Sequence, residues 1–234
     1  MYTIYSELCQ VDRMMTERPL TRARLSDQIE ERLRDELRAG TIVQGERLTE
    51  LNIAARYGAS RTPVREALIQ LHRDGLIDGG ERGFRVPLPS RRDMLDRLEV
   101  RELLDRRIAA HVARISTNDE IEELRLLLAD QEGSCEDVEP EAFVAANLAF
   151  RRRLRALCGN PVLERTAAMV DDQFQVMRGA LQRLPAVRRM TLRHNRAILD
   201  AIAARDAAGA EDAVSGFVEE LRRQSAGDRA TGID

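Results

Sequence analysis

The sequence predicts a mainly α-helical fold. We expect an N-terminal winged helix-turn-helix, made of three helices and a β-hairpin, followed by an antiparallel all-α bundle of six to seven helices. Two observations support this fold. Residues 21–88 contain three short helical patterns and then glycine-rich strand signals, whereas residues 90–224 contain helical patterns alone. Pro87 and Pro89 lie between the two parts, so we expect the domain boundary there.

Four segments follow from this division of the 234 residues. Residues 1–20 lack periodicity and are expected to form an N-terminal arm. Residues 21–88 are expected to form the winged helix-turn-helix domain, and residues 89–226 the helical domain. A frayed tail is expected at 227–234.

Capping residues delimit the three helices of the first domain. The first helix is expected to begin at Ser26 and to end before Gly40. Thr49 has the character of an N-cap for a short second helix that Gly58 closes, and Ser60 is expected to cap the third. The apolar positions that recur at helical spacing are Ile29, Leu33 and Leu37 in the first helix and Val64, Ala67, Leu68 and Leu71 in the third.

The β-hairpin is expected directly after the third helix. Residues 76–77, Leu-Ile, predict its first strand, and Gly83-Phe84-Arg85-Val86 predict its second. The sequence Asp78-Gly79-Gly80 is typical of the tight turn between them.

Helical periodicity predicts the elements of the second domain, with glycine and proline at the joints. At residues 158–161, Cys-Gly-Asn-Pro, the glycine is expected to end one helix, the asparagine to cap the next and the proline to begin it. The expected helices cover roughly residues 90–115, 118–134, 140–158, 161–183, 186–205 and 208–224.

Composition and charge limit the possible functions. The net charge of −3 argues against a protein that binds polyanions over its whole surface, and residues 21–88 hold 12 Arg against 11 Asp plus Glu. Any nucleic-acid contact must therefore come from locally placed arginines. No apolar run approaches the roughly 20 residues that span a bilayer. The absence of a signal-peptide pattern and of paired cysteine spacing predicts a cytoplasmic protein with no membrane partner.

The stretch GASRTPVREALIQLHRDGLI, residues 58–77, places two arginines in the first turns of the third helix. In a helix-turn-helix the second helix inserts its N-terminal residues into the major groove of DNA. Ser60 and Thr62 can donate hydrogen bonds to phosphate there. Arg61 and Arg65 lie four residues apart and share a face, and arginine can contact guanine through two hydrogen bonds.

These arginines could instead form a solvated surface on which they pair with Glu66 and Asp74. The flanking helices and the hairpin stretch Arg82-Gly83-Phe84-Arg85 favour DNA contact. We therefore predict double-stranded DNA as a partner.

The stretch GERLTELNIAARYGASRTPVREALIQLHRDGLIDGGERGFRV resembles the DNA-binding domain of GntR-family bacterial transcription regulators. The resemblance covers residues 22–88 and includes the recognition helix SRTPVREAL and the wing RGF. It implies that Gly83 lets the wing approach the minor groove. Some members carry an arginine early in the second helix, where this sequence has Leu51. The expected DNA-contacting residues are Thr49, Ser60, Arg61, Thr62, Arg65, Arg82 and Gly83.

The second domain is similar to that of the FadR-type branch of GntR regulators. The stretches RLEVRELLDRRIAAHVA and RHNRAILDAIAARDAAGAEDAV carry this similarity, which spans most of residues 90–224. It implies a homodimer that binds a two-fold symmetric operator, most often as a repressor, and a helical domain that binds a small effector.

Many members of that branch hold a divalent metal with one aspartate and three histidines. In this sequence the corresponding positions are Asn147, Arg151, His194 and approximately Phe217. One histidine, one amide and a cation do not supply the three or four deprotonated ligands that such a metal needs. The prediction is therefore no metal and no cofactor.

Polar side chains on apolar helix faces nevertheless predict an effector pocket. Arg101 and Asp105 share a face of the first bundle helix, Asn147 and Arg151 lie on or beside the apolar face of the third, and His194 lies within an apolar stripe. The alternative is that Arg101 pairs with Asp105 and His194 is a core histidine. An arginine at a metal position favours capture of a carboxylate or phosphate, so a small organic acid is the expected effector class.

Two other functions stay open on the sequence alone. The bundle could serve only for dimerisation, in a constitutive DNA-binding regulator without an effector. The helical domain could also be an enzyme. We do not expect an enzyme, because the chain has no phosphate-binding glycine loop, no nucleophile motif and only three histidines.

Overall fold

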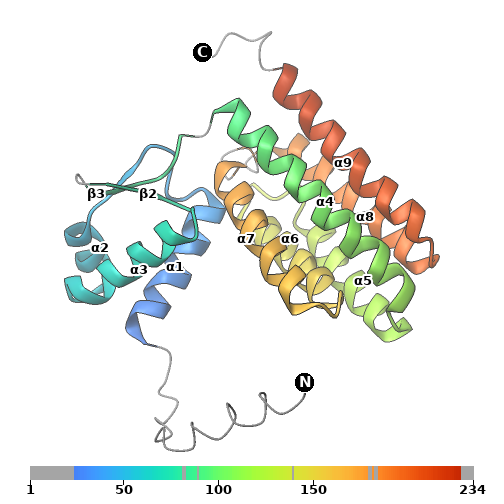
Figure 1. The fold of residues 1–234 in the computed structure, drawn as a ribbon, viewed down its shortest axis with the longest axis horizontal. Coiled ribbons are helices and arrows are strands. Elements are labelled where there is room, and N and C mark those ends of the chain that lie inside the picture. The colour runs from blue at the N-terminus through green and yellow to red at the C-terminus, as the bar shows by residue number, and fades with distance from the viewer. Residues whose placement is uncertain are drawn as a thin grey trace, which may run out of the picture.

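The computed structural model describes residues 24–80, 83–88, 90–138, 140–178, 181 and 184–227. The expected arm at 1–20 and the expected tail beyond residue 227 lie outside these ranges. Within them the chain is mainly helical, as predicted. A small N-terminal body of three helices and a three-stranded sheet lies beside a body of six helices (Figure 1).

The three helices of the N-terminal body are found where the sequence predicts them. They are α1 (Leu25–Ala39), α2 (Glu50–Tyr57) and α3 (Arg61–Arg73). The Thr49 side chain accepts a hydrogen bond from the Asn52 backbone N–H at 3.3 Å, which caps α2. Gly58 ends α2 with a φ of 62°, a left-handed conformation that glycine adopts without steric cost.

The sheet differs from the predicted hairpin. Its strands are β1 (Arg47–Leu48), β2 (Asp78–Gly80) and β3 (Gly83–Arg85), in the antiparallel order β1-β3-β2. The expected strand at 76–77 and turn at 78–80 are therefore wrong, and β1 was not expected. Leu76 and Ile77 are both buried in the domain core instead of alternating between two faces. Glycine suits β2 because a Cβ on Gly79 would lie 3.1 Å from the His72 ring.

The core of the N-terminal body joins all three helices to the sheet. Leu33, Leu68 and Leu71 are fully buried at its centre. One side chain from the second body, Val176, belongs to the same cluster. The two bodies therefore share a continuous apolar contact.

The second body consists of six helices within the described ranges, close to the predicted positions. They are α4 (Arg91–Ile115), α5 (Asn118–Gly133), α6 (Glu141–Ala156), α7 (Pro161–Arg178), α8 (Pro185–Ala203) and α9 (Ala207–Gly227). Local signals place their starts: Ser90 and Asp93 form a capping box before α4, and the Asn160 side chain accepts from the first backbone N–H groups of α7.

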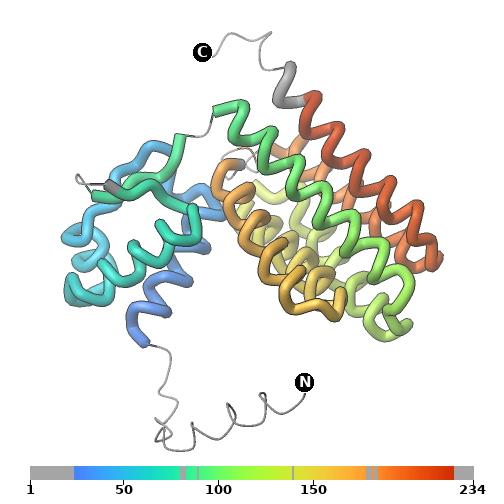
Figure 2. The backbone as a smooth tube through the Cα atoms, in the orientation of Figure 1, coloured from blue at the N-terminus to red at the C-terminus, as the bar shows by residue number. Residues whose placement is uncertain are grey.

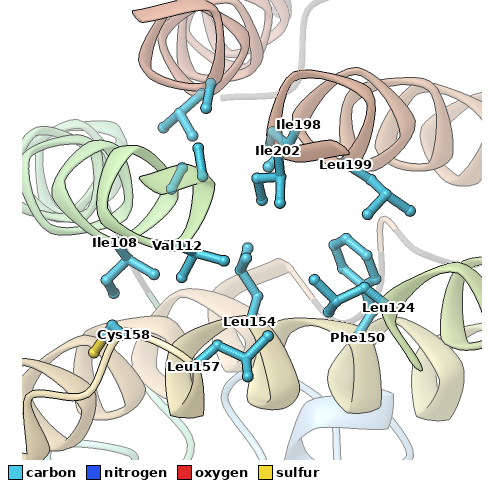
Figure 3. Packing of buried hydrophobic residues seen from close by; sticks show 14 of the residues in the cluster. Ile108, Val112, Leu124, Phe150, Leu154, Leu157, Cys158, Ile198, Leu199 and Ile202 are labelled. Carbon is cyan, nitrogen blue, oxygen red and sulfur yellow. The ribbon is translucent and has the colours of Figure 1, made fainter. Parts of the chain in front are cut away.

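All six helices contribute side chains to the bundle core. Figure 3 shows Ile108 and Val112 of α4 facing Leu154 of α6, with Ile198 and Ile202 of α8 above them. The α7 helix lies at the edge of the bundle beside α1, as the backbone path in Figure 2 shows. None of the helices in the described ranges combines the length and apolar character that a membrane crossing requires.

Candidate DNA-binding surface and candidate anion site

The first turn of α3 projects away from the protein. Val64, Ala67, Leu68 and Leu71 anchor the opposite face of the helix in the core. The side chains of Arg61 and Arg65 are each 70% exposed. Ser60, the N-cap, makes no capping hydrogen bond with its side chain, and Pro63 lies in the first turn, where its missing N–H removes no helical bond. The start of α3 therefore presents two arginines and the helix N-terminus to a ligand.

Glu50 of α2 contacts both arginines. Arg61 Nη2 donates to Glu50 at 2.9 Å, and Arg65 Nε lies 3.7 Å from the same carboxylate. Asp74, one of the partners considered from the sequence, pairs with Arg34 and accepts from Gln70. Glu50 thus holds the two exposed arginines side by side, and any anion that binds them must compete with its carboxylate.

The small sheet carries two further exposed arginines. Arg85 of β3 lies opposite Arg47 of β1 in the strand register, and both are exposed. Gly83 begins β3 with a φ of 98°, which disfavours any residue with a Cβ. The sequence could not point to Arg47 because β1, only two residues long, was not predicted. Arg82 lies outside the described residues.

Of the other expected DNA contacts, Thr49 uses its side chain to cap α2, and Thr62 lies in the exposed first turn of α3. The Thr49 side chain therefore helps to hold the start of α2.

Five charged side chains meet inside the second body, and we call them the arginine cluster. They are Arg101 and Asp105 of α4, Arg151 and Arg155 of α6, and Asp171 of α7. Arg151 Nε donates to both carboxylate oxygens of Asp171 at 3.0 Å, and its Nη2 donates to Asp105 at 3.0 Å. Arg155 Nη1 donates to Asp171 at 2.7 Å, and Arg101 Nε donates to Asp105 at 3.1 Å.

The arginine cluster has a surplus positive charge. Three guanidinium groups face two carboxylates, a net of +1, although Arg101 is only 3% exposed and Asp171 only 1%. Arg101 is the least completely paired member: its Nη2 lies 3.6 Å from Asp171, and its Nη1 is buried without a hydrogen-bond partner. A buried cation without sufficient counter-charge is unfavourable in free energy. One more anion next to Arg101 would therefore be electrostatically favourable.

The pKa values follow this arrangement. Burial alone would raise the pKa of Asp171, but the charges of Arg151, Arg155 and Arg101 outweigh it and hold the pKa far below its usual value. Burial, and next the like charge of Arg151, lower the pKa of Arg101. Arg151 moves in the opposite direction: burial would lower its pKa, but Asp171 and Asp105 raise it. Arg101 thus differs from Arg151 in lacking sufficient negative charge.

Two aromatic rings partly compensate Arg101. Its guanidinium carbon lies 4.6 Å from the centroid of the Phe174 ring and 5.4 Å from that of Phe217. His194 packs against Phe217, with 5.0 Å between the two ring centroids. Its Nε2 lies 2.7 Å from a carboxylate oxygen of Glu220. Phe217 thus contacts both His194 and Arg101.

Asn147 belongs to a different buried group. Its side-chain oxygen accepts hydrogen bonds from Gln131 at 2.9 Å and from Asn195 at 3.0 Å, which links α6 to α5 and α8. Of the five residues expected in an effector pocket, the structure therefore brings Arg101, Asp105 and Arg151 together, whereas Asn147 and His194 make contacts outside the arginine cluster. Sequence reasoning missed Asp171 and Arg155, whose roles depend on which helices pack together.

Three of the residues that the resemblance places at metal-ligand positions are engaged in other contacts or lack a donor atom. Asn147 is engaged with two amides, Arg151 is a cation held by two carboxylates, and Phe217 is apolar. Within the part of the chain that the structure describes, no three histidine, cysteine or acidic side chains are grouped as metal ligands.

A small cavity adjoins the arginine cluster. Its volume is about 10 Å³, and Asp105, Arg151, Arg155 and Phe217 contribute to its walls. This is room for about one water molecule. An organic acid can enter only if the helices around the cluster move apart or if the side chain of Asp105 or Asp171 moves away from the arginines.

Comparison with known proteins adds independent findings. The family described as "Bacterial regulatory proteins, gntR family" matches residues 25–86, and the FCD domain matches residues 96–220. The chain is similar to the HTH-type transcriptional repressor NanR of Enterobacter sp. (strain 638), with 27% identity over 234 residues, covering 90% of this chain and 89% of that protein. It is 30% identical to NanR of Escherichia coli O127:H6 over 173 residues, 65% of each chain.

Two solved structures share the fold. Escherichia coli McbR/YncC has a TM-score of 0.75 at 24% identity, covering 87% of this chain and 98% of that one. A GntR transcriptional regulator from Rhodococcus sp. RHA1 has a TM-score of 0.74 at 23% identity, covering 86% and 97%.

Proposed function

Because the chain belongs to the bacterial gntR family and carries an FCD domain, we propose that it represses transcription at an operator bound by α3 and the wing, under the control of a small anion bound at the arginine cluster. It is a DNA-binding transcription regulator with an effector domain and not an enzyme. The observation that carries the proposal for the effector is the buried, incompletely paired guanidinium of Arg101.

The proposed DNA contacts divide between affinity and sequence recognition. Ser60, Thr62 and the N-terminus of α3 contact phosphates, and Arg61 and Arg65 enter the major groove. Their exposure and their common partner Glu50 support this role, because they are already aligned on one face. Phosphates that approach the surface compete with Glu50 for the arginines.

The proposed effector carries a carboxylate or a phosphate. Arg101 supplies an unused donor, Nη1, and the net charge of +1 favours a ligand with at least one negative charge. The rings of Phe174 and Phe217, both close to the Arg101 guanidinium, suit an organic acid with an apolar portion. In this proposal no metal takes part, since Arg151, a cation, stands where the resemblance to the family implies a metal ligand.

We also propose that the repressor is a homodimer and its operator two-fold symmetric. Val100 and Leu103 leave apolar side chains exposed on the outer side of α4, which supports self-association through the helical domain. Light scattering of the purified protein tests this: a mass near twice 26.5 kDa is expected, and a monomer that still binds a symmetric operator would contradict it.

A constitutive regulator without an effector is the second candidate. The observation that favours it is the size of the cavity, about 10 Å³, which holds no organic acid in this conformation. In that case the arginine cluster would serve only to hold α4, α6 and α7 together.

A thermal-shift screen of the full chain separates the two candidates. The probes are inorganic phosphate and a panel of small mono- and dicarboxylates, with a chelator present throughout. At least one probe should raise the melting temperature of the wild-type protein and of Arg106→Met, a control that removes an arginine of α4 paired with Glu211 outside the cluster. The same probe should have no effect on Arg101→Met. A response that needs added divalent metal, or no response to any probe, would overturn the proposal of anion capture.

A further inference from the structure

Three consecutive residues of α7 contact three different parts of the protein. Asp171 points into the arginine cluster, where Arg151 and Arg155 hold it. Asp172 and Gln173, the next two residues, contact the N-terminal body. We call residues 171–173 the coupling segment. A rigid helix that carries these three side chains cannot move one of them without moving the others.

Asp172 ties α7 to α1. Arg34 Nη1 donates to one of its carboxylate oxygens at 2.9 Å, and Arg38 donates to the other through Nε at 3.1 Å and Nη2 at 2.6 Å. The three side chains are only 17%, 10% and 9% exposed. They are therefore screened much less by salt than a surface ion pair would be.

Gln173 ties α7 to the end of the recognition helix. Its Nε2 donates to the backbone oxygen of Asp74, the C-cap of α3, at 2.8 Å. Arg34 pairs with the carboxylate of Asp74 while it also holds Asp172. Asp74 is thus bound to the coupling segment once directly and once through Arg34.

The following turn of α7 completes the junction. Val176 packs in the core of the N-terminal body, and the Met177 backbone oxygen accepts from Gln44 Nε2 at 2.7 Å. A shift of α7 by one or two ångströms, which is typical of helices in regulatory transitions, would disturb all of these contacts.

We propose that the coupling segment transmits occupancy of the arginine cluster to the recognition helix. In the effector-free protein Asp171 serves as an internal anion for Arg151 and Arg155. An effector anion that binds the cluster competes with Asp171, loosens its hold on α7 and so changes the contacts that Asp172 and Gln173 make with α1 and α3. This inference rests on the proposed function, because it names how the same site controls DNA binding.

Reciprocity follows from linkage. If the anion weakens the docking of the N-terminal body on α7, then operator DNA that favours the docked arrangement must weaken anion binding by the same factor.

A different route from the arginine cluster to the N-terminal body would run through α4, which begins directly after the N-terminal body and carries Asp105.

Hydrogen exchange of the full chain, measured by mass spectrometry without any ligand, separates the two routes. Asp171→Asn and Asp105→Asn remove the same charge from the same cluster, and each loses a contact with Arg151 at 3.0 Å. Only the first lies on α7. Asp171→Asn should speed exchange of the amides of residues 28–38 by about tenfold or more, whereas Asp105→Asn should alter α4 and leave these amides near the wild-type rate.

A second pair of variants tests the outward contact. In an Asp172→Asn background, where α1 has already lost its partner, Asp171→Asn should add little to the exchange of residues 28–38. Equal effects of Asp171→Asn and Asp105→Asn on those residues, or no effect of either, would overturn the role of the coupling segment. If Asp171→Asn fails to fold, Asp171→Glu shifts the carboxylate by one methylene and keeps its charge, with the same expected pattern.

The outcome distinguishes the two proposals. A silent anion screen together with the expected exchange pattern would refute the effector and leave the mechanical link standing. Anion binding without the exchange pattern would refute the coupling segment alone.

Discussion

Arg101 and Arg151 are both buried arginines of one cluster, but we expect their removal to have very different consequences. The informative pair of variants is Arg101→Met and Arg151→Met. Methionine keeps an unbranched apolar side chain of similar length and removes the guanidinium group. The side chains are 3% and 6% exposed, so both changes act in the protein interior.

The contacts determine the expected magnitudes. Arg101→Met loses one hydrogen bond to Asp105, worth roughly 1.5–3 kcal/mol, and contacts with two aromatic rings. It also removes a buried donor without a partner, which destabilises the wild type by roughly 1–3 kcal/mol, and it balances the cluster at two positive and two negative charges. These effects oppose one another, so we expect the free energy of unfolding to stay within about 2 kcal/mol of the wild type.

Arg151→Met has no such compensation. It leaves Asp171 and Asp105 with weaker partners inside the bundle, and loss of one member of a buried ion pair typically costs about 3–5 kcal/mol. Urea unfolding followed by circular dichroism measures both values. If Arg101→Met destabilised the protein as much as Arg151→Met, Arg101 would be an essential structural cation and not a surplus one.

Three further predictions concern the DNA surface and the pH dependence. Arg65→Ala should weaken binding to a duplex selected by the wild-type protein by roughly 1–3 kcal/mol and relax base preference, as measured by fluorescence anisotropy; unchanged affinity would remove Arg65 from the base contacts. Glu50→Gln should tighten binding to unrelated DNA by up to about fivefold, because an exposed ion pair contributes at most about 1 kcal/mol, and a loss of affinity would mean that Glu50 positions the arginines instead. The folded pKa of Asp171 is depressed, so its stabilisation is present above its unfolded pKa and is lost as pH falls toward the folded value. The stability gap between wild type and Asp171→Asn, from urea titrations at several pH values, should therefore be full above a pH of about 5 and shrink below about 4; a gap that widened in acid would contradict the ion pairing.

The conformational state of the arginine cluster bears on all of these experiments. The cavity of about 10 Å³ beside the cluster does not admit an organic acid, and Asp171 and Asp105 are the anions that Arg151 contacts. Binding must then include the work of opening the bundle, so the measured affinity reports both the contacts and that work.

The sequence by itself determined the helices and their ends. Thr49 and Gly58 act through backbone groups within a few residues of them, and the apolar spacing of α3 is visible within 13 residues. These signals can therefore be read without knowledge of the rest of the fold. The functional class was predicted from the resemblance to known regulators, and the family matches confirm that resemblance. The hairpin was misplaced because Leu76 and Ile77 lie in the core directly before a strand of aspartate and glycines, where strand propensity is a weak guide.

Only the tertiary structure decided which charges meet. Arg151 finds Asp105 on α4 and Asp171 on α7, 46 and 20 residues away in the chain, and Glu50 reaches Arg61 across the turn between α2 and α3. Periodicity shows that such side chains face inward. It cannot show how many oppositely charged side chains from other helices lie next to them. The surplus charge on Arg101, the closed cavity and the adjacent contacts of Asp171 and Asp172 all depend on helix packing, because ion pairs form between whichever side chains the packed helices bring within a few ångströms.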